Sequence, residues 1–527
     1  MNKAVFALVA ILYLLSVSSI TGLIHLAKAD GGTVYIRADG SIDPPTAPIS
    51  TIDNVTYVFT GNTNDSVVVE RDNIVINGSG YTLSGIWSYS RGIDLTGRSN
   101  ITINDINILA FEYGIYLSSS SNVNISRNNL TDDSAAAICI NSSSNNNANG
   151  NILTTNFIGI FLESSSSNNS ASENNIVGDT TDYGSARFFY GIEIVSSSNN
   201  TLNENMITNN DDGIDLYSSS NNSIIGNDII KNNYFGGSGI FLSNSTSNGI
   251  EGNNIANNYN GVTVDESSNN NSLIGNNITA SESWGVGLDS SSGNCLYHNN
   301  IINNTNQVVS GLSANVWDAG YSSGGNYWSD YTGTDNNQDG IGDTPYLISY
   351  SNDADHYPLM GAFQSFNVSL YEEYEGLIQN EEVDIISNST IGQVYLSWAD
   401  DARNPPTYMD WFLVLSGFAG QNGTVGFCRI TLPNDILNST SYHVGTMVQY
   451  VNDNLTISKV LSSNGTYTTL YFTYEVPNPT PFPEFEIIII PEFPSLIVLS
   501  LFMIATLLAV VVYKKKVMKN KLKLDRI

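Results

Sequence analysis

The sequence predicts an all-β protein: a right-handed parallel β-helix with three strands per turn, followed by a small β-sandwich and one C-terminal transmembrane helix. Three observations predict it. A Gly-Ile-x-Leu tetrapeptide recurs through residues 91–305, asparagines recur at the same period, and an unbroken apolar run lies near the C-terminus. No α-helix fits the repeat, because apolar residues alternate with period two and Asn, Gly and Ser interrupt every run.

The tetrapeptide occurs nine times, at steps of 22 to 32 residues. A near-constant period of this size is typical of stacked units, each of which buries its inward side chains against the neighbouring turns. The glycine before each isoleucine predicts a corner that needs positive φ or a close backbone approach. The right hand is expected from the crossover rule for parallel strands. The copies begin at Gly92, Gly114, Ala137, Gly159, Gly191, Gly213, Gly239, Gly261 and Gly285.

Two polar columns accompany the tetrapeptide. Asparagines stacked on their own copies about 4.8 Å apart can form amide ladders along the axis. The first predicted column is Asn104, Asn128, Asn151, Asn174, Asn205, Asn227, Asn253, Asn276 and Asn299. The second is Asp133, Asn156, Asp179, Asn210, Asn232, Asn258 and Asn304.

The segments around the repeat define the remaining domains. Residues 1–29 have a basic start, an apolar run and an Ala27-Lys28-Ala29 cleavage signature, so they predict a signal peptide, with an uncleaved anchor as the alternative. Residues 30–90 are expected to form an N-terminal cap with the first irregular turns, followed by the regular β-helix over 91–305 and its C-terminal cap over 306–361. Residues 362–476 alternate as β-strands and suit a β-sandwich.

The C-terminal end predicts membrane attachment. A Pro-rich stalk over 477–495 precedes the apolar residues 496–513, which are long enough to span a bilayer as a helix. The basic tail over 514–527 would face the cytoplasm, which leaves the bulk of the chain extracellular on a single-pass membrane protein. Many Asn-x-Ser/Thr sequons predict a glycoprotein.

Charge and cysteine content exclude other classes. The chain has 50 acidic and 19 basic residues and a net charge of −31, which disfavours a nucleic-acid partner. Its three cysteines cannot form a disulfide framework, because the count is odd.

The repeat with its asparagine columns resembles the NosD-like branch of right-handed β-helix proteins, which carry carbohydrate-binding and sugar hydrolase type repeats. The block Gly324-Gly325-Asn326-Tyr327-Trp328-Ser329-Asp330-Tyr331, with Asp339-Gly340-Ile341-Gly342-Asp343-Thr344-Pro345-Tyr346, looks like the block that ends the helix in archaeal members. Pro491-Glu492-Phe493-Pro494-Ser495 is similar to the Pro-Glu-Phe anchoring tails of archaeal surface proteins. The resemblance is specific for the fold rather than for an activity.

Because NosD is associated with copper delivery, the resemblance raises the question of a copper site. Copper prefers thiolate, thioether and imidazole ligands. The exported histidines are His298, His356 and His443, and they form no close cluster in sequence with the cysteines or methionines. No copper site is evident from the sequence.

A calcium site is predicted in the C-terminal cap. Its ligands would be Asp335, Asn337, Asp339, the Ile341 carbonyl and Asp343, with Gly340 at the turn, as in the first part of a calcium loop. Tyr346 stands where an EF-hand has its closing glutamate. An Asx-rich turn without a metal is therefore the alternative.

The candidate catalytic residues are Glu193, Asp212 and Asp215. Asn210-Asp211-Asp212-Gly213-Ile214-Asp215 looks like a motif of β-helical polygalacturonases. Glu193 and Asp215 take the same outward position on consecutive turns, about 5 Å apart, which suits glycoside chemistry. The insertion before Gly191 would bring Arg187, Phe188, Phe189 and Tyr190 close to them.

The polygalacturonase motif is incomplete. Gly237-Ser238-Gly239 stands where those enzymes carry an acidic pair, and no His or Arg-x-Lys partner follows. Solvated acids on an acidic protein are the alternative. The outward aromatics Tyr116, Phe161 and Phe241 could stack on sugar rings, although their separation along the coil favours ordinary surface packing.

The sequence thus predicts a membrane-anchored extracellular β-helix protein with a structural or glycan-binding role and polysaccharide as its partner. The alternative is a polysaccharide-processing enzyme, either a glycoside hydrolase or a lyase. A copper-site accessory protein ranks third.

Overall fold

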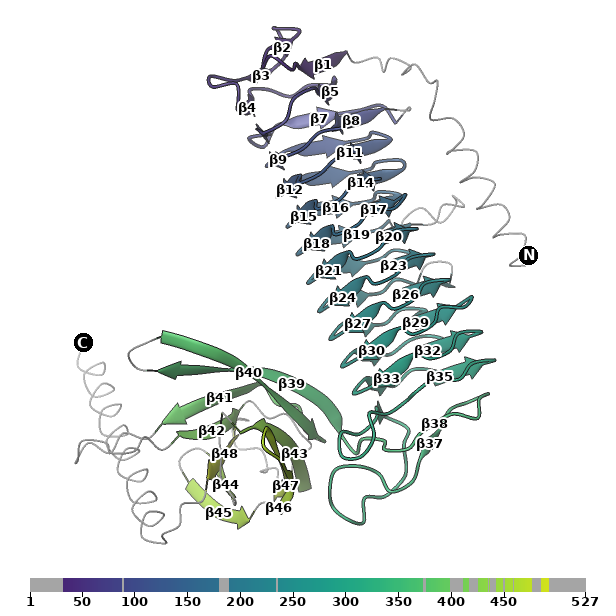
Figure 1. Ribbon diagram of the computed structural model, residues 1–527, viewed down its shortest axis with the longest axis vertical. Helices are drawn as coiled ribbons and strands as arrows, with labels where there is room; N and C mark the ends of the chain where they lie inside the picture. Colours follow the sequence, from purple (N-terminus) through teal and green to yellow (C-terminus); the bar gives the residue numbers. More distant parts are fainter. Residues whose placement is uncertain are drawn as a thin grey trace, which may run out of the picture. The chain divides into compact units, whose positions relative to one another are not determined.

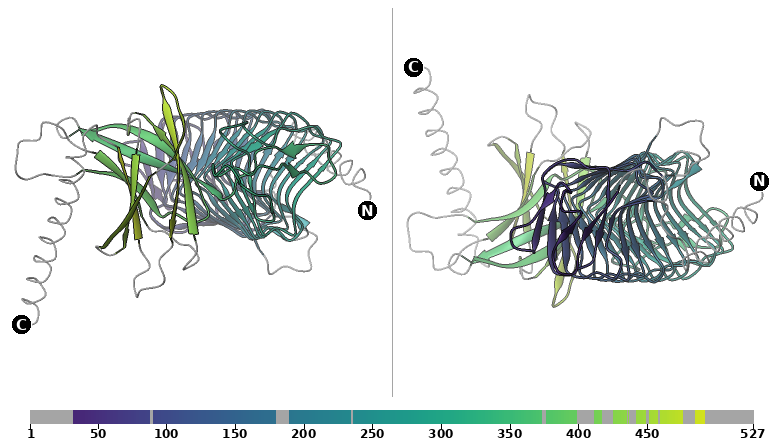
Figure 2. Two further views of the ribbon diagram at one scale, coloured as in Figure 1. Left: turned by 90° about the horizontal axis from the view of Figure 1, so that it is seen from below. Right: turned by 90° about the horizontal axis from the view of Figure 1, so that it is seen from above.

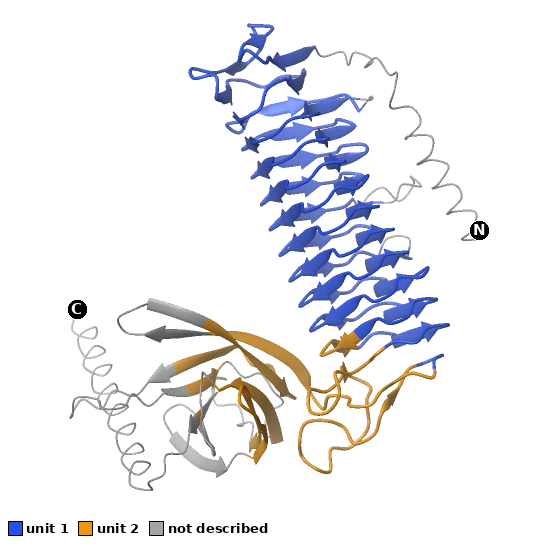
Figure 3. Ribbon diagram, in the orientation of Figure 1, with its two compact units in different colours: residues 1–295, 303–315, 349–351 blue, residues 296–302, 316–348, 352–527 orange. Residues whose placement is uncertain are grey.

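The computed structural model describes residues 32–87, 90–179, 189–233, 236–372, 376–398, 411–416, 425–434, 436, 442–448, 451–457, 459–475 and 485–491. It divides into two compact units (Figure 3). Unit 1 comprises residues 1–295, 303–315 and 349–351, and unit 2 comprises residues 296–302, 316–348 and 352–527. Each unit is described by itself below.

Unit 1 is a coil of three parallel sheets (Figure 1). The 13-stranded sheet runs in the order β2 (Ile42–Asp43), β1 (Thr33–Ile36), β5 (Ser66–Val69), β8 (Arg91–Asp94), β11 (Tyr113–Ser118), β14 (Ala136–Asn141), β17 (Ile158–Glu163), β20 (Tyr190–Val195), β23 (Asp212–Tyr217), β26 (Ser238–Ser243), β29 (Asn260–Asp265), β32 (Trp284–Asp289) and β35 (Asn306–Gly311). Figure 2 shows the stacked strands from both ends.

The other two sheets consist of shorter strands. One runs through β7 (Thr82–Ser84), β10 (Asn107–Leu109), β13 (Asn129–Thr131), β16 (Ile152–Thr154), β19 (Asn175–Val177), β22 (Met206–Thr208), β25 (Asp228–Ile230), β28 (Asn254–Ala256) and β31 (Asn277–Thr279). The other runs through β3 (Ile49–Ser50), β4 (Thr56–Phe59), β6 (Ile74–Asn77), β9 (Ile101–Asn104), β12 (Asn124–Ser126), β15 (Asn147–Asn149), β18 (Ser170–Ser172), β21 (Thr201–Asn203), β24 (Ser223–Ile225), β27 (Gly249–Glu251) and β30 (Ser272–Ile274), and β33 (Cys295–Tyr297) lies at the division between the units.

The repeated apolar positions form the core of the coil. Ile115, Ile138 and Ile160 are register partners on successive turns, and all three are fully buried. The second apolar residue of each tetrapeptide, such as Leu117 or Leu162, is buried beside them. Three parallel sheets around one apolar core confirm the predicted β-helix.

The tetrapeptide glycines are needed for close approach and not for positive φ. A Cβ on Gly159 would lie 2.5 Å from the Gly191 carbonyl oxygen, and one on Gly213 would lie 2.5 Å from the Gly239 oxygen. Neither glycine has positive φ. Of the two predicted reasons for these glycines, the structure therefore supports only the close packing of successive turns.

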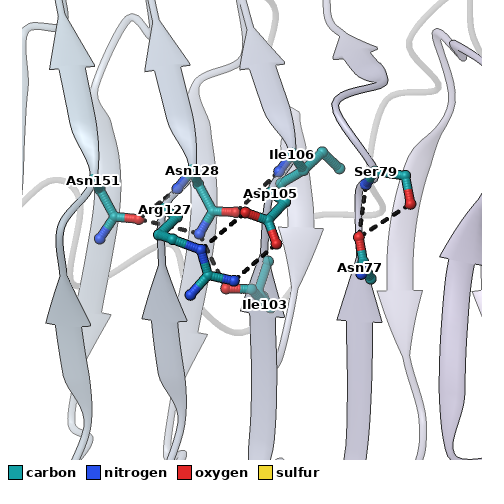
Figure 4. Close-up of polar contacts among 8 residues, drawn as sticks. All are labelled: Asn77, Ser79, Ile103, Asp105, Ile106, Arg127, Asn128 and Asn151. Atoms are coloured by element: carbon teal, nitrogen blue, oxygen red, sulfur yellow. Dashed lines mark hydrogen bonds and ion pairs between the residues drawn. The ribbon is translucent and has the colours of Figure 1, made fainter.

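The first asparagine column forms a buried ladder (Figure 4). The backbone N–H and the Nδ2 of Asn128 both donate to Asn151 Oδ1, at 3.0 and 3.1 Å. The same pattern continues through Asn174, Asn205, Asn227, Asn253 and Asn276. Asn104 was predicted wrongly: the register pairs Ile103 with Ile125, so the buried Ile106 takes the ladder position in that turn.

A further ladder was not predicted. It comprises Asn146, Asn169, Asn200, Asn222, Asn248, Asn271, Asn294 and Asn315, each donating through Nδ2 to the Oδ1 of the next. The residue before most of them, such as Asn145 or Asn199, has positive φ and turns the corner. The Ser-Asn runs of the sequence are therefore structural corners, which an alignment of the repeats at their own period could have identified.

The limits of the coil differ from the predicted ones. Within residues 30–90, β1 and β5 already pair in parallel, and only β2 and β3 add antiparallel pairs that cap the end. At the other end β35 still pairs in parallel with β32, so the regular stack in unit 1 extends beyond residue 305. The N-terminal strands and β35 lack the Gly-Ile-x-Leu tetrapeptide, but both keep apolar side chains at the inward positions.

Unit 2 begins with a small layer of short strands. β34 (Asn300–Ile302) pairs in parallel with β36 (Tyr327–Trp328), and β37 (Tyr346–Leu347) pairs with β38 (Ala354–Asp355). Asp355 holds this layer together, because its Oδ2 accepts bonds from Asn326 N at 2.7 Å and from Trp328 Nε1 at 2.8 Å.

Two five-stranded antiparallel sheets complete unit 2. One consists of β39 (Ala362–Glu372), β40 (Gly376–Ser387), β43 (Val425–Pro433), β47 (Tyr467–Glu475) and β46 (Lys459–Ser463). The other consists of β41 (Gln393–Trp398), β42 (Trp411–Ser416), β48 (Phe485–Pro491), β44 (Tyr442–Val448) and β45 (Val451–Ile457). Both contribute to one apolar core, with Ile385 and Ile430 from the first sheet and Leu413 and Ile489 from the second.

Strand β48 corrects the predicted stalk. Residues 485–491 were placed in the Pro-rich stalk, yet they form the central strand of the second sheet. The reason is the run Ile487 to Ile490, whose β-branched side chains favour a strand between two partners. The predicted signal peptide, membrane segment and basic tail lie outside the described residues. Within the part of the chain that is described, no helix has the length and apolar character needed to cross a membrane.

Candidate functional site

Five acidic residues gather on the 13-stranded sheet at β17, β20 and β23. The register pairs Phe161 with Glu193, Glu193 with Asp215 and Asp215 with Phe241, so these side chains occupy one outward column. Strand spacing places neighbours in that column about 4.8 Å apart. Asp212 is the partner of Tyr190 in a parallel column. Glu163 and Asp211 complete the group, which we call the acidic cluster.

The acidic cluster is crowded with like charges. Burial raises the pKa of Glu193, and the charges of Glu163 and Asp212 raise it further. Burial also raises the pKa of Asp215 well above its usual value, with Asp212 and Glu193 adding to the effect. For Asp212 the cause is again burial, opposed by the Ser238 N–H that donates to its Oδ1 at 2.5 Å. Protons are therefore retained in this cluster near neutral pH.

Hydrogen bonding leaves part of the cluster unsatisfied. Asp215 Oδ1 is shielded from solvent and has no hydrogen-bond partner among the described residues. Asp211 is buried and accepts a 2.6 Å bond from Phe189 N, and burial raises its pKa to about 7. In the described part of the chain, none of the five carboxylates forms an ion pair with a lysine or arginine. The cluster is thus electrostatically suited to a hydrogen-bond donor or a proton.

The motif predicted from polygalacturonases divides into structural and outward residues. Asn210 is structural, because its Nδ2 donates to Asn232 Oδ1 at 3.0 Å inside the second asparagine column. Asp211 holds the backbone of Phe189. Asp215 faces outward with Glu193, as predicted, and Asp212 lies beside them in the column of Tyr190. Of the neighbours predicted for them, Arg187 and Phe188 lie outside the described residues.

Aromatic side chains adjoin the acidic cluster. Tyr116 and Phe161 pack against the fully buried Cys139 between them, and Tyr190 joins the same group. The register leaves one turn between Tyr116 and Phe161, as the predicted separation requires, and both side chains pack against Cys139 in that turn. Phe241 lies beyond the two carboxylates of the column. A stretch of the sheet thus presents aromatic rings followed directly by carboxylates, and we call it the aromatic-acidic face.

The predicted calcium loop is held by its own hydrogen bonds. Asp335 Oδ1 and Oδ2 accept from the backbone N–H groups of Asp339 and Gly340, at 3.0 and 2.8 Å. Asp339 Oδ1 accepts from the buried Ile341, and Asp343 Oδ2 accepts from Asn336 N.

Two basic side chains also reach this loop. Lys459 Nζ donates to the Asn337 carbonyl at 2.8 Å, and Arg429 Nη1 donates to the Asp339 carbonyl at 2.7 Å. A calcium ion would therefore compete with backbone N–H groups for the carboxylate oxygens, while the two cations bind backbone carbonyls of the same loop.

Calcium binding at this loop stays a prediction with a direct test. If the ion binds, the full-length protein should melt at a higher temperature in calcium than in chelator, because a ligand of the folded state stabilises it. Asp335→Asn should remove that difference, whereas Asp39→Asn, an exposed acid in unit 1, should preserve it. Equal melting temperatures with and without calcium in the unmodified protein would rule out the site.

The stacked sheets and ladders define a right-handed parallel β-helix, and comparison with known families agrees. Residues 24–176 match the family described as "Right handed beta helix region" and residues 170–333 match the family described as "Periplasmic copper-binding protein (NosD)". These two matches support a likeness to NosD-like right-handed β-helix proteins. Among curated proteins, no sequence matches it.

Solved structures share the coil at low similarity. The A-module of the mannuronan C-5 epimerase AlgE6 of Azotobacter vinelandii has 16% identity and a TM-score of 0.38, over 54% of this chain and 89% of its own. The surface adhesin PfbA of Streptococcus pneumoniae has 12% identity and a TM-score of 0.35, over 63% and 87%. The catalytic domain of a GH87 alpha-1,3-glucanase has 13% identity and a TM-score of 0.31, over 52% and 59%.

The described side chains do not fit a copper ion. Copper would need several thiolate, thioether or imidazole ligands in one place. Cys139 and Cys428 are buried in separate units, and within the described ranges no three His, Cys, Asp or Glu side chains are arranged to hold a metal. No step involving copper is therefore derived for this chain.

Proposed function

We propose that the protein binds polysaccharide outside the cell through the aromatic-acidic face. The observation that carries this proposal is the column of Phe161, Glu193 and Asp215, which are register partners on three successive strands of one sheet face. Aromatic rings pack on the apolar faces of sugars, and carboxylates accept hydrogen bonds from sugar hydroxyls. Parallel strands repeat these groups along the coil axis, as an extended polymer requires.

The charge of the face restricts the polymer. Glu193, Asp212 and Asp215, which have no paired lysine or arginine in the described ranges, would repel uronate or sulfate groups when they are ionised. Neutral polysaccharides and amino-sugar polymers avoid that repulsion. The Asp215 oxygen that lacks a partner would gain a donor from a sugar hydroxyl. We propose further that the C-terminal segment predicted to span the membrane displays this face at the cell surface.

A binding experiment on the full-length protein tests the proposal. A panel of neutral, amino-sugar and acidic polysaccharides should show binding to neutral or amino-sugar polymers and none to acidic ones. Glu193→Gln and Phe161→Ala should each weaken binding about tenfold, as expected for one lost hydrogen bond or stacking contact. Glu251→Gln, an exposed acid on β27 of another sheet, is the matched control. Absence of binding across the panel would refute the proposal.

A second candidate function is cleavage of the bound polysaccharide. Glu193 and Asp215 are register partners with raised pKa values, and their strand spacing is near the ~5–5.5 Å carboxyl separation of retaining glycosidases. The protonated carboxyl would protonate the leaving oxygen, while the ionised one attacks the anomeric carbon; water would then release the sugar. New reducing ends that disappear in Asp215→Asn would establish this activity, and binding without reducing ends would exclude it.

A further inference from the structure

Unit 2 contains a cavity that none of the functions above uses. It measures about 220 Å³ and lies over the sheet β39-β40-β43-β47-β46. Its floor is a row of side chains on neighbouring strands, since the register pairs Asp384 with Thr431 and Thr431 with Thr469. Ser462 extends the row on β46. The cavity is larger than one or two waters need and smaller than the ~300–1,000 Å³ of drug-sized sites.

The floor offers polar atoms with spare hydrogen-bonding capacity. Asp384 Oδ1 is shielded from solvent and has no hydrogen-bond partner among the residues described. Thr431 Oγ1 and Thr469 Oγ1 lie 3.3 Å apart, and each hydroxyl can accept a further bond. Burial raises the pKa of Asp384 to about 6, with the charge of Glu382 adding to it. A donor that entered the cavity would offset the desolvation of this carboxylate.

The walls are held in place by contacts within unit 2. The ring of His298 stacks on Phe363 with centroids 4.2 Å apart, and its Nε2 lies 3.2 Å from Ser323 Oγ. Arg429 is 2% exposed and donates to the carbonyl oxygens of Asp339 and Ser322. Such walls suit a ligand that binds without rearrangement of the cavity.

The charges around the cavity select against ions. Asp384 would repel an anion, and the guanidinium of Arg429 would repel a cation, while burial lowers the pKa of His298 and keeps its ring neutral. A carboxylate and several hydroxyls beside aromatic side chains match a neutral ligand that carries many hydroxyl groups and one apolar face. Tyr467 is 46% exposed at the cavity and available for stacking.

We propose that this cavity binds a single sugar ring of a neutral glycan, with Asp384 accepting hydrogen bonds from its hydroxyls, Thr431 and Thr469 completing the floor, and Tyr467 covering one face. This site shares no residue with the aromatic-acidic face, so it stands or falls independently of the proposed function.

Saturation-transfer NMR and calorimetry on the full-length protein test the proposal with glucose, galactose, mannose, glucosamine and glucuronate as probes. At least one neutral hexose should bind with a Kd on the order of 1 mM, a value typical of a single small ligand. Asp384→Asn and Tyr467→Ala should each weaken this binding about tenfold or more. Tyr467 is exposed, so its variant is informative even if Asp384→Asn fails to fold.

Two controls make the outcome decisive. Glu382→Gln alters another acid of β40, which does not line the cavity, and should keep the hexose affinity within about twofold. Glu193→Gln should leave hexose binding unchanged, although it weakens polysaccharide binding at the other face. Absence of binding by every neutral hexose, preferential binding of glucosamine or glucuronate, or unchanged affinity in both cavity variants would overturn the proposal.

Discussion

Replacing Asn128 by alanine is expected to lower the free energy of unfolding by about 3 kcal/mol, the largest effect of any single substitution considered for the coil. Asn128 is 1% exposed, and its Nδ2 donates to Ile103 O and to Asn151 Oδ1 (Figure 4). Its Oδ1 accepts the buried N–H of Ile106 at 3.2 Å. Alanine would leave that N–H without its acceptor and interrupt the ladder.

Thermal unfolding followed by circular dichroism should show a midpoint lower by roughly 5–10 °C for Asn128→Ala. Hydrogen exchange should speed up first at the Ile106 amide, because the lost bond is local. Asn129→Ala is the matched control, because the Asn129 side chain is exposed and its Nδ2 donates only a 3.4 Å bond to Asn107 Oδ1. Similar losses in both variants would show that the buried ladder contributes no more than a surface amide.

The second large effect concerns pH and the acidic cluster. Asp215→Asn should leave the melting temperature nearly unchanged at pH 4 and raise it by about 3–5 °C at pH 8. Burial raises the pKa values of Glu193, Asp212 and Asp215 above those of the unfolded chain, like charges raise those of Glu193 and Asp215 further, and that of Asp211 reaches about 7. The folded state therefore retains protons that the unfolded state has released.

The direction of the pH effect follows from that difference. Stability from these groups is fully present below the unfolded pKa values near 4 and is lost as the pH rises through the raised folded pKa values, which are about 7 for Asp211 and Glu193. Asparagine at position 215 removes part of the repulsion only at pH values at which Asp215 itself would be ionised. Asp228→Asn, an exposed acid on β25, should not reproduce the gain. A gain of equal size at pH 4 and pH 8 would contradict this origin.

The two large predictions bear on function in opposite ways. The ladder asparagines are buried and only stabilise the coil, whereas the acidic cluster destabilises it at neutral pH. Residues retained at a cost in stability are typical of binding and catalytic sites. A variant such as Asp215→Asn that gains stability and loses polysaccharide binding would therefore separate a functional role from a structural one.

Much of the coil could be predicted because its information is local and repeated. The period places Asn128 under Asn151 and Glu193 beside Asp215, and the register confirms both pairs. Asn104 failed because it pairs with Ser126, two positions before the ladder residue Asn128, an offset that only the strand register reveals. The cluster around Cys139 was missed because outward side chains two turns apart meet through the residue between them.

The amino-acid sequence by itself determined the β-helix, the stacking of its asparagines and the outward position of the candidate carboxylates, because each follows from a period that the chain repeats. Only the tertiary structure decided which acids crowd together, that residues 485–491 become the central strand of a sheet, and that Asp384, Thr431 and Thr469 line one cavity. Those features depend on antiparallel pairing and burial between segments distant in sequence, where no period relates one residue to another.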